Sequence, residues 1–212
     1  MSSRVTTMTK IFIATLSLLL LAACSRSPQT LYYTITAPEA IESSLKKDKV
    51  HAIRVGPVFL PKYLDRPQIV TRTGEHEFQI DDFARWVEPI DDAFLRAFSV
   101  TLNNETPDYF VYEFGMGSTL LESTAWLVPV DIRQFDVNDD GVATLSLQWG
   151  LEDAQSKRII YAKTDKFTRP AGGSYSSQSK AMSLLIEDFA REVARVIKAT
   201  PRPEPQKDEA NK

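Results

Sequence analysis

The chain has 212 residues, of which 43% are hydrophobic and 25% charged, and its formal net charge is −3 at pH 7. This length suits one domain with a sizeable core, and the acidic balance opposes nucleic-acid binding, which requires a basic face. The single cysteine, Cys24, excludes a disulfide within the chain and a thiolate metal cluster, so stability must come from the core.

The first predicted element is a signal peptide over residues 1–23. An apolar run follows Lys10, ends in small residues, and is shorter than the roughly 20 apolar residues of a membrane-spanning helix. Met8 is an alternative start, because Met8-Thr9-Lys10 alone would supply the basic flank. An ordinary secretory signal followed by an unrelated cysteine is the competing interpretation.

Leu21-Ala22-Ala23-Cys24 closely resembles the lipobox of bacterial lipoproteins. This resemblance implies cleavage before Cys24, a diacylglycerol on its sulfur and an N-acyl chain, such as palmitate, on its amine. No other cofactor is expected. Two or three acyl chains anchor a protein stably, because each buried methylene contributes about 0.8 kcal/mol. In such lipoproteins an aspartate after the cysteine usually means retention at the inner membrane, and here Ser25 follows the cysteine instead. The expected location is therefore the inner, periplasmic leaflet of an outer membrane.

Residues 24–30 are predicted to form the lipidated tether and residues 31–199 the folded domain. The seven residues from Cys24 to Leu31 span at most about 25 Å when fully extended, so the domain lies close to its membrane. Residues 200–212 are too polar to bury and too rich in proline for a helix, which predicts a disordered tail.

Within this domain the hydrophobic pattern switches between the strand period and the helix period. Strand patterns occur over residues 50–58, 68–72, 77–80, 109–114, 126–137, 144–151 and 159–167. At Gln134 the alternation slips by one residue, which predicts a β-bulge. Helical stripes begin at Val87 and, after Gly172-Gly173, at Met182. The prediction is an α+β fold, with an antiparallel or mixed sheet and two main helices packed on one face.

Two segments of the domain carry a specific resemblance. Residues 55–72 read VGPVFLPKYLDRPQIVTR, and residues 83–90 read FARWVEPI. Both are similar to signature segments of the PqiC-like (YmbA-type) lipoproteins, the auxiliary lipoproteins of transport systems built around MCE proteins. The similarity extends from about Leu31 to Ala199, and the lipobox precedes it where this family places it.

The resemblance implies a non-enzymatic subunit of intermembrane lipid transport, anchored in the outer membrane, that docks a periplasm-spanning MCE-domain partner and supports envelope integrity. It also implies that the chain can form a homo-oligomeric ring. Two other classes compete: a structural or assembly lipoprotein of another envelope complex, and a lipid-active enzyme. The enzyme is disfavoured because the two histidines, His51 and His76, have no neighbouring residues that would complete a catalytic triad or a metal site.

The predicted partner-binding residues lie in and near residues 59–67, which we call the proline loop. They are Phe59, Leu60, Pro61, Tyr63, Leu64, Asp65, Arg66 and Trp86. Prolines fix φ and lower the entropy cost of ordering the loop. Its large apolar side chains either pack under the domain or bind a partner, and Trp86 either locks a helix onto the sheet or binds. An ion pair of Arg66 with Glu88 or Asp91 would make the motif structural.

Residues 136–141 read DVNDDG and resemble the first half of an EF-hand calcium loop. The last ligand position of such a loop falls on Leu147, where a bidentate glutamate is required, and the flanking residues alternate as strands do. We therefore expect a hairpin turn of the Asp-Gly kind and no metal site.

Overall fold

The computed structural model describes residues 28–41, 51–115 and 124–201. The chain divides into two units, Met1–Thr30 and Leu31–Lys212, and the helices and strands given below belong to the second unit. The predicted signal peptide, Cys24 and most of the predicted tail lie outside the described residues. None of the described helices is both long enough and apolar enough to cross a membrane.

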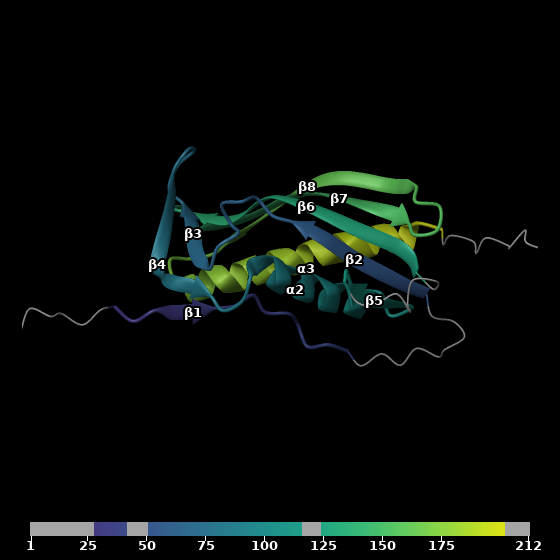
Figure 1. Cartoon of the computed structure of the whole chain (residues 1–212), viewed down its shortest axis with the longest axis horizontal. Coiled ribbons are helices and arrows are strands. Elements are labelled where there is room, and N and C mark those ends of the chain that lie inside the picture. Colours follow the sequence, from purple (N-terminus) through teal and green to yellow (C-terminus); the bar gives the residue numbers. More distant parts are fainter. Residues whose placement is uncertain (1–27, 42–50, 116–123, 202–212) are drawn as a thin grey trace, which may run out of the picture. The chain divides into compact units, whose positions relative to one another are not determined.

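The described part of the second unit contains eight strands and two helices. In chain order the elements are β1 (Leu31–Tyr33), β2 (His51–Phe59), β3 (Gln68–Arg72), β4 (Phe78–Trp86), α2 (Ile90–Glu105), β5 (Tyr109–Glu113), β6 (Thr124–Asn138), β7 (Val142–Asp153), β8 (Ile159–Pro170) and α3 (Tyr175–Ala199). These eight strands form one mixed sheet, and α2 and α3 pack together on one face of it (Figure 1). This arrangement confirms the predicted α+β fold with two helices on one face.

Strand β6 organises the sheet, because both of its edges are paired. One edge pairs antiparallel with β7, whereas the other pairs in parallel with β2 along its first half and with β3 at its end. The register with β7 shifts between Ile132 and Gln134, which confirms the predicted bulge. Strands β3 and β4 form an antiparallel hairpin, and the short β1 adds in parallel to β4.

Aromatic side chains from both helices fill the core between helices and sheet. Phe98 of α2 and Phe189 of α3 stack with ring centroids 4.7 Å apart, and Phe94 meets Phe135 of β6 edge-on at 5.7 Å. The core face of β7 adds the buried side chains of Leu145, Leu147, Trp149 and Leu151. Full burial of a side chain of this size contributes about 1.5–3 kcal/mol, so this core can hold the fold without staples.

Helix α2 begins at Ile90 and not at Val87, where the sequence pattern first places a helical stripe. Pro89 is the N-cap residue, with ψ of 134°. A residue before proline is driven out of the helical region, so Glu88 cannot belong to the helix. Trp86 instead ends β4, and its backbone N–H donates to the Pro67 carbonyl at 2.7 Å. The end of β4 is thereby held against the proline loop.

Candidate functional site

The proline loop joins β2 to β3 and folds back on the domain. Its turn closes through a hydrogen bond from the Leu64 N–H to the Pro61 carbonyl at 3.0 Å. Leu64 is only 4% exposed and belongs to the core, and Leu60 and Tyr63 pack against that core. Phe59, in contrast, is 58% exposed. The large apolar side chains of the loop therefore divide between the two predicted alternatives, because three contact the domain and one faces solvent.

A buried polar cluster fastens the proline loop to the sheet. The Tyr63 hydroxyl donates to Asp136 Oδ2 at 2.8 Å, and Arg72 Nη2 donates to the same oxygen at 2.9 Å. Gln134 Nε2 donates to Asp136 Oδ1 at 2.8 Å. Because Asp136 is 1% exposed, water cannot solvate its carboxylate, and these donors stabilise the negative charge instead. Burial and the Asp136 carboxylate raise the pKa of Tyr63 well above its ordinary value, so the hydroxyl stays protonated and remains a donor.

This cluster gives a structural role to the first residue of the calcium-like segment, since Asp136 is paired with Arg72. The segment then forms the turn between β6 and β7, where the Gly141 N–H donates to the Asn138 carbonyl at 3.0 Å. Gly141 adopts φ of +71°, a conformation that favours glycine. Within residues 28–41, 51–115 and 124–201, no three carboxylate, histidine or cysteine side chains are grouped so as to hold a metal ion.

Calcium is therefore expected to leave the stability of the protein unchanged. Melting temperatures of the wild type and of Asp140→Ala should each be the same in millimolar calcium and in chelator, because the turn lacks the bidentate glutamate that completes an EF-hand. Differential scanning fluorimetry measures this directly. A wild-type melting temperature that rises with calcium, and does so no longer in Asp140→Ala, would restore the ion site.

The two segments that carry the family resemblance meet at one pocket of about 300 Å³, which we call the loop–helix pocket. It is lined by Leu64, Asp65, Arg66, Pro67, Trp86, Val87, Glu88, Pro89, Ile90 and Asp91. Leu64, Trp86 and Ile90 are buried and provide its apolar floor. Arg66 and Val87 are exposed at its rim. A desolvated apolar centre surrounded by a polar rim is the usual anatomy of a protein-binding site.

Arg66 is the rim residue best placed to bind a partner. Glu88, one of the two carboxylates predicted to pair with it, forms an ion pair with Arg96 instead. The neighbouring Asp65 pairs with Lys62 at 3.1 Å. The Arg66 side chain is exposed and forms no ion pair with any residue that the structure describes, which leaves its planar set of donors for a carboxylate from outside the chain.

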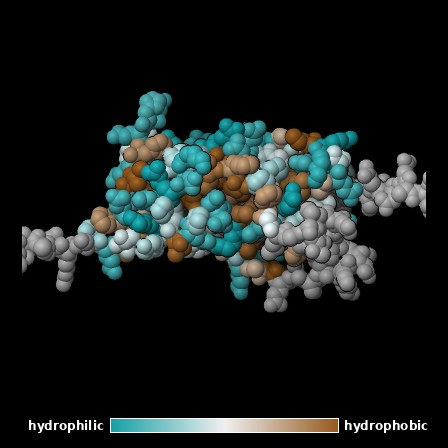
Figure 2. All heavy atoms as spheres, viewed as in Figure 1, coloured by the Kyte–Doolittle hydropathy of each residue, from teal (hydrophilic) through white to brown (hydrophobic). Residues whose placement is uncertain are grey.

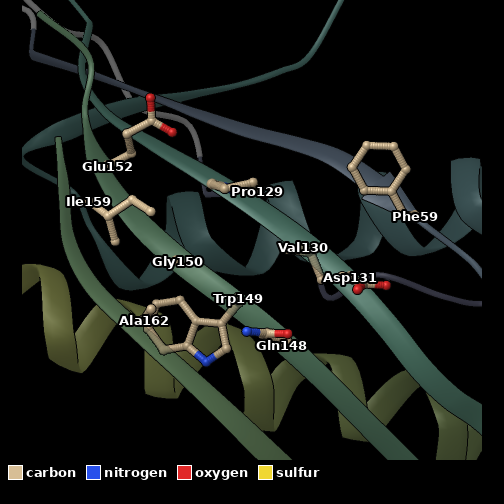
Figure 3. Close-up of a pocket in the computed structure, with 10 residues that line it drawn as sticks. All are labelled: Phe59, Pro129, Val130, Asp131, Gln148, Trp149, Gly150, Glu152, Ile159 and Ala162. Carbon is tan, nitrogen blue, oxygen red and sulfur yellow. The ribbon is translucent and has the colours of Figure 1, made fainter. Parts of the chain in front are cut away.

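A second hollow, the outer-face groove, lies over strands β2, β6, β7 and β8. It has a volume of about 230 Å³ and is lined by Phe59, Pro129, Val130, Asp131, Gln148, Trp149, Gly150, Glu152, Ile159 and Ala162 (Figure 3). Gly150 follows the core-facing Trp149, so it faces away from the helices, and it pairs with Ala162 across β7 and β8. These two small residues leave the surface hollow between Phe59 and Ile159, both of which are more than half exposed. Hydrophobic side chains also gather over the middle of the face shown in Figure 2.

The structure divides the predicted partner-binding residues among different environments. The loop–helix pocket brings together Leu64, Asp65, Arg66 and Trp86, whereas Phe59 lines the outer-face groove. Leu60, Pro61 and Tyr63 line neither of these two hollows. Because Leu64 and Trp86 are buried, a partner can contact only the small part of each side chain that faces the pocket. Partner binding itself stays a prediction for all of these residues.

Two exposed apolar residues at these hollows, Val87 and Ile159, do not figure in the predicted site. Val87 follows the last residue of β4, and Ile159 is the first residue of β8. Periodicity places residues on the face of an element, and it is least informative at an element's ends. The one available signal was adjacency, because Val87 directly follows the predicted site residue Trp86.

Comparison with solved structures finds this fold in other proteins. An uncharacterized protein superposes with a TM-score of 0.66 at 18% sequence identity, and the match covers 80% of this chain and 99% of that chain. Protein XCC0632 from Xanthomonas campestris, of the DUF330 family, gives a TM-score of 0.56 at 16% identity, with 80% and 99% covered. The PelC dodecamer from Paraburkholderia phytofirmans is more distant, with a TM-score of 0.39 at 14% identity over 74% of this chain and 93% of that chain. At these identities the first two structures show the fold alone.

The sequence itself identifies the family. Comparison with curated protein sequences gave no match. A family model described as the ABC-type transport auxiliary lipoprotein component matches residues 33–194, which is more than half of the chain. The matched range includes both signature segments and every residue that lines the loop–helix pocket. This chain therefore belongs to the family of ABC-type transport auxiliary lipoprotein components, which confirms its resemblance to the PqiC-like lipoproteins.

Proposed function

We propose that this chain is a non-enzymatic subunit of an MCE-type intermembrane lipid transport system. In this proposal, lipids on Cys24 anchor it in the periplasmic leaflet of the outer membrane, where it docks the periplasm-spanning MCE-domain partner and supports envelope integrity. Family membership supports the coarser part, an auxiliary lipoprotein of a transport system. The docking role rests on one observation, namely that both signature segments, residues 55–72 and 83–90, converge on the loop–helix pocket. A homo-oligomeric ring would repeat this pocket around its axis.

The pocket suits docking because its walls are ordered before a partner arrives. The hydrogen bond from the Trp86 N–H to the Pro67 carbonyl ties the end of β4 to the proline loop. Pro67 and Pro89 restrict the backbone on either side of the pocket. Preorganised contacts lose little conformational entropy on binding, so the affinity for a partner is higher than a mobile loop would allow. We expect the partner to present an apolar side chain to the floor and a carboxylate to Arg66.

Reversing the charge of Arg66 tests this docking role. Arg66→Glu should weaken capture of the MCE-domain partner by about tenfold, which corresponds to about 1.4 kcal/mol, because a carboxylate there repels the partner's acidic group. The melting temperature should stay at the wild-type value, since Arg66 is exposed. Lys180→Glu, which reverses an exposed charge on α3, is the matched control in pull-downs from solubilised envelopes. Equal capture by the two variants would contradict the docking role.

Removing the anchor should release the protein from the membrane. Cys24→Ala is expected to give an unprocessed precursor or a mislocalised protein, because acyl chains supply the strong membrane affinity that the proposal requires. Intact-mass spectrometry of the wild-type protein should show a mature chain that starts at a lipidated Cys24. An unmodified N-terminus at another residue would contradict the lipoprotein anchor.

A further inference from the structure

A patch of exposed apolar residues lies where the described domain begins. Tyr32 of β1 is 63% exposed and Phe83 of β4 is 44% exposed. We call these two aromatic residues the edge patch. Side chains of this size are usually buried, and a cluster of them on a surface marks an interaction site.

Strand pairing places the members of the patch side by side. Strand β1 is the last strand at its end of the sheet, and it pairs in parallel with β4 alone among the described strands. Tyr32 is the partner of Arg85, and Phe83 lies two residues before Arg85 in β4. Residues two apart in a strand share a face, so Tyr32, Arg85 and Phe83 form one row. Leu31 pairs with Ala84, between Phe83 and Arg85, so its side chain points to the opposite face and is not part of this row.

The length of chain that precedes the patch determines what it can meet. Cys24 lies seven residues before Leu31, so an acyl chain on Cys24 holds Leu31 within about 25 Å of the bilayer. At so short a distance the local concentration of lipid at the patch is very high, and even a weak affinity is enough to fix an orientation. Aromatic side chains favour the headgroup region of a bilayer, and Arg85, which lies in the same row, can extend to the phosphates.

We propose that the edge patch rests in the headgroup region of the membrane that carries the anchor. Orientation then follows from the fold. Strands β1 and β4 lie at one end of the sheet, and the turn between β7 and β8 lies at the other (Figure 1). The β1–β4 end faces the bilayer, and the end that begins β8 at Ile159 faces the periplasm. This inference rests on the anchored location in the proposed function.

Tryptophan quenching by brominated lipids tests the orientation. The full-length lipidated protein is reconstituted into phosphatidylethanolamine–phosphatidylglycerol vesicles with bromine in the acyl chains, as Tyr32→Trp or Phe83→Trp. The matched control is Ile159→Trp, because Ile159 is an apolar residue that is 71% exposed at the other end of the sheet. The wild type gives the background from its three native tryptophans. Both patch variants should lose tryptophan emission beyond that background, and the control should not.

Several results would overturn the inference. Equal quenching at positions 32 and 159 would mean that the domain has no preferred face, and quenching at neither would mean that the patch does not reach the lipid. Loss of partner capture in Tyr32→Glu without lipid quenching would assign the patch to a protein. Flotation of the vesicles separates this failure from that of the proposed function. Protein that floats without quenching rejects the orientation alone, whereas protein that does not float rejects the anchor and the orientation together.

Discussion

Replacing Tyr63 and Leu64 together by alanine is expected to lower the free energy of unfolding by about 5 kcal/mol. Leu64 is 4% exposed, so its truncation leaves a cavity in the core beneath the proline loop. The loss of Tyr63 removes a hydroxyl that donates to Asp136 at 2.8 Å and leaves that carboxylate short of one donor. Urea denaturation followed by tryptophan fluorescence measures the change.

Phe59→Ala is the matched control for this double variant, because Phe59 is a large apolar residue of the same loop that is 58% exposed. Its unfolding midpoint should stay close to that of the wild type, since surface substitutions usually change stability by less than about 0.5 kcal/mol. An unchanged midpoint in the Tyr63→Ala, Leu64→Ala variant, together with a loss of partner capture, would show that these side chains act in an interface and not in the core.

The second large effect is expected at Asp136. Asp136→Ala should destabilise the domain by about 3 kcal/mol, because it leaves buried donors without an acceptor and Arg72 without its counter-ion. We place the value at the low end of the range for buried ion pairs, since the Arg72 side chain is 25% exposed and water can solvate part of it. Thermal and urea denaturation should agree on the loss.

Asp139→Ala provides the comparison, because Asp139 is an exposed carboxylate in the adjoining turn. It should leave the unfolding midpoint unchanged within about 0.5 kcal/mol. If Asp136→Ala were as stable as Asp139→Ala, the cluster of Tyr63, Arg72 and Gln134 would not be what fastens the proline loop to the sheet.

The fold could be predicted from the sequence where one face of an element is buried and the other is exposed to solvent. Strand β7 shows this best, because from Leu145 to Leu151 its buried side chains alternate with more exposed ones. The bulge in β6 was readable for the same reason, since the change of phase at Gln134 moves apolar residues to the other parity. Strand β1 is too short for a period to appear and was not predicted.

The candidate site was less predictable, because its geometry depends on contacts between distant residues. Nothing in the order of residues distinguishes the buried Leu64 from the exposed Phe59, since Leu64 lies in a loop, which has no period, and Phe59 is the last residue of β2, where periodicity is least informative. Asp136 resembled a calcium ligand because of the spacing of residues 136–141. Its actual partner, Arg72, could not be recognised because it lies 64 positions away in the sequence. The loop–helix pocket forms because the register of β3 and β4 shifts between Gln68 and Ile69, which brings the end of β4 to the proline loop.

What the sequence did supply was the pair of signature segments, and the structure adds that they share a pocket. Arg66 comes from the first segment and Val87 from the second, and both are exposed at its rim. Sequence similarity alone could not separate these exposed residues from Trp86, which is 7% exposed. The exposure of each residue in the structure therefore identifies the signature residues whose entire side chain is available to a partner.

Photo-crosslinking in intact cells tests the docking role most directly. A photoreactive amino acid replaces Arg66 at the rim of the loop–helix pocket, Val87 in a second strain, and Lys180 on α3 in the control strain. The docking role predicts that positions 66 and 87 crosslink to an MCE-domain protein and that position 180 does not. Crosslinks to that protein from position 180 alone, or from positions 66 and 87 only to an unrelated envelope protein, would contradict it.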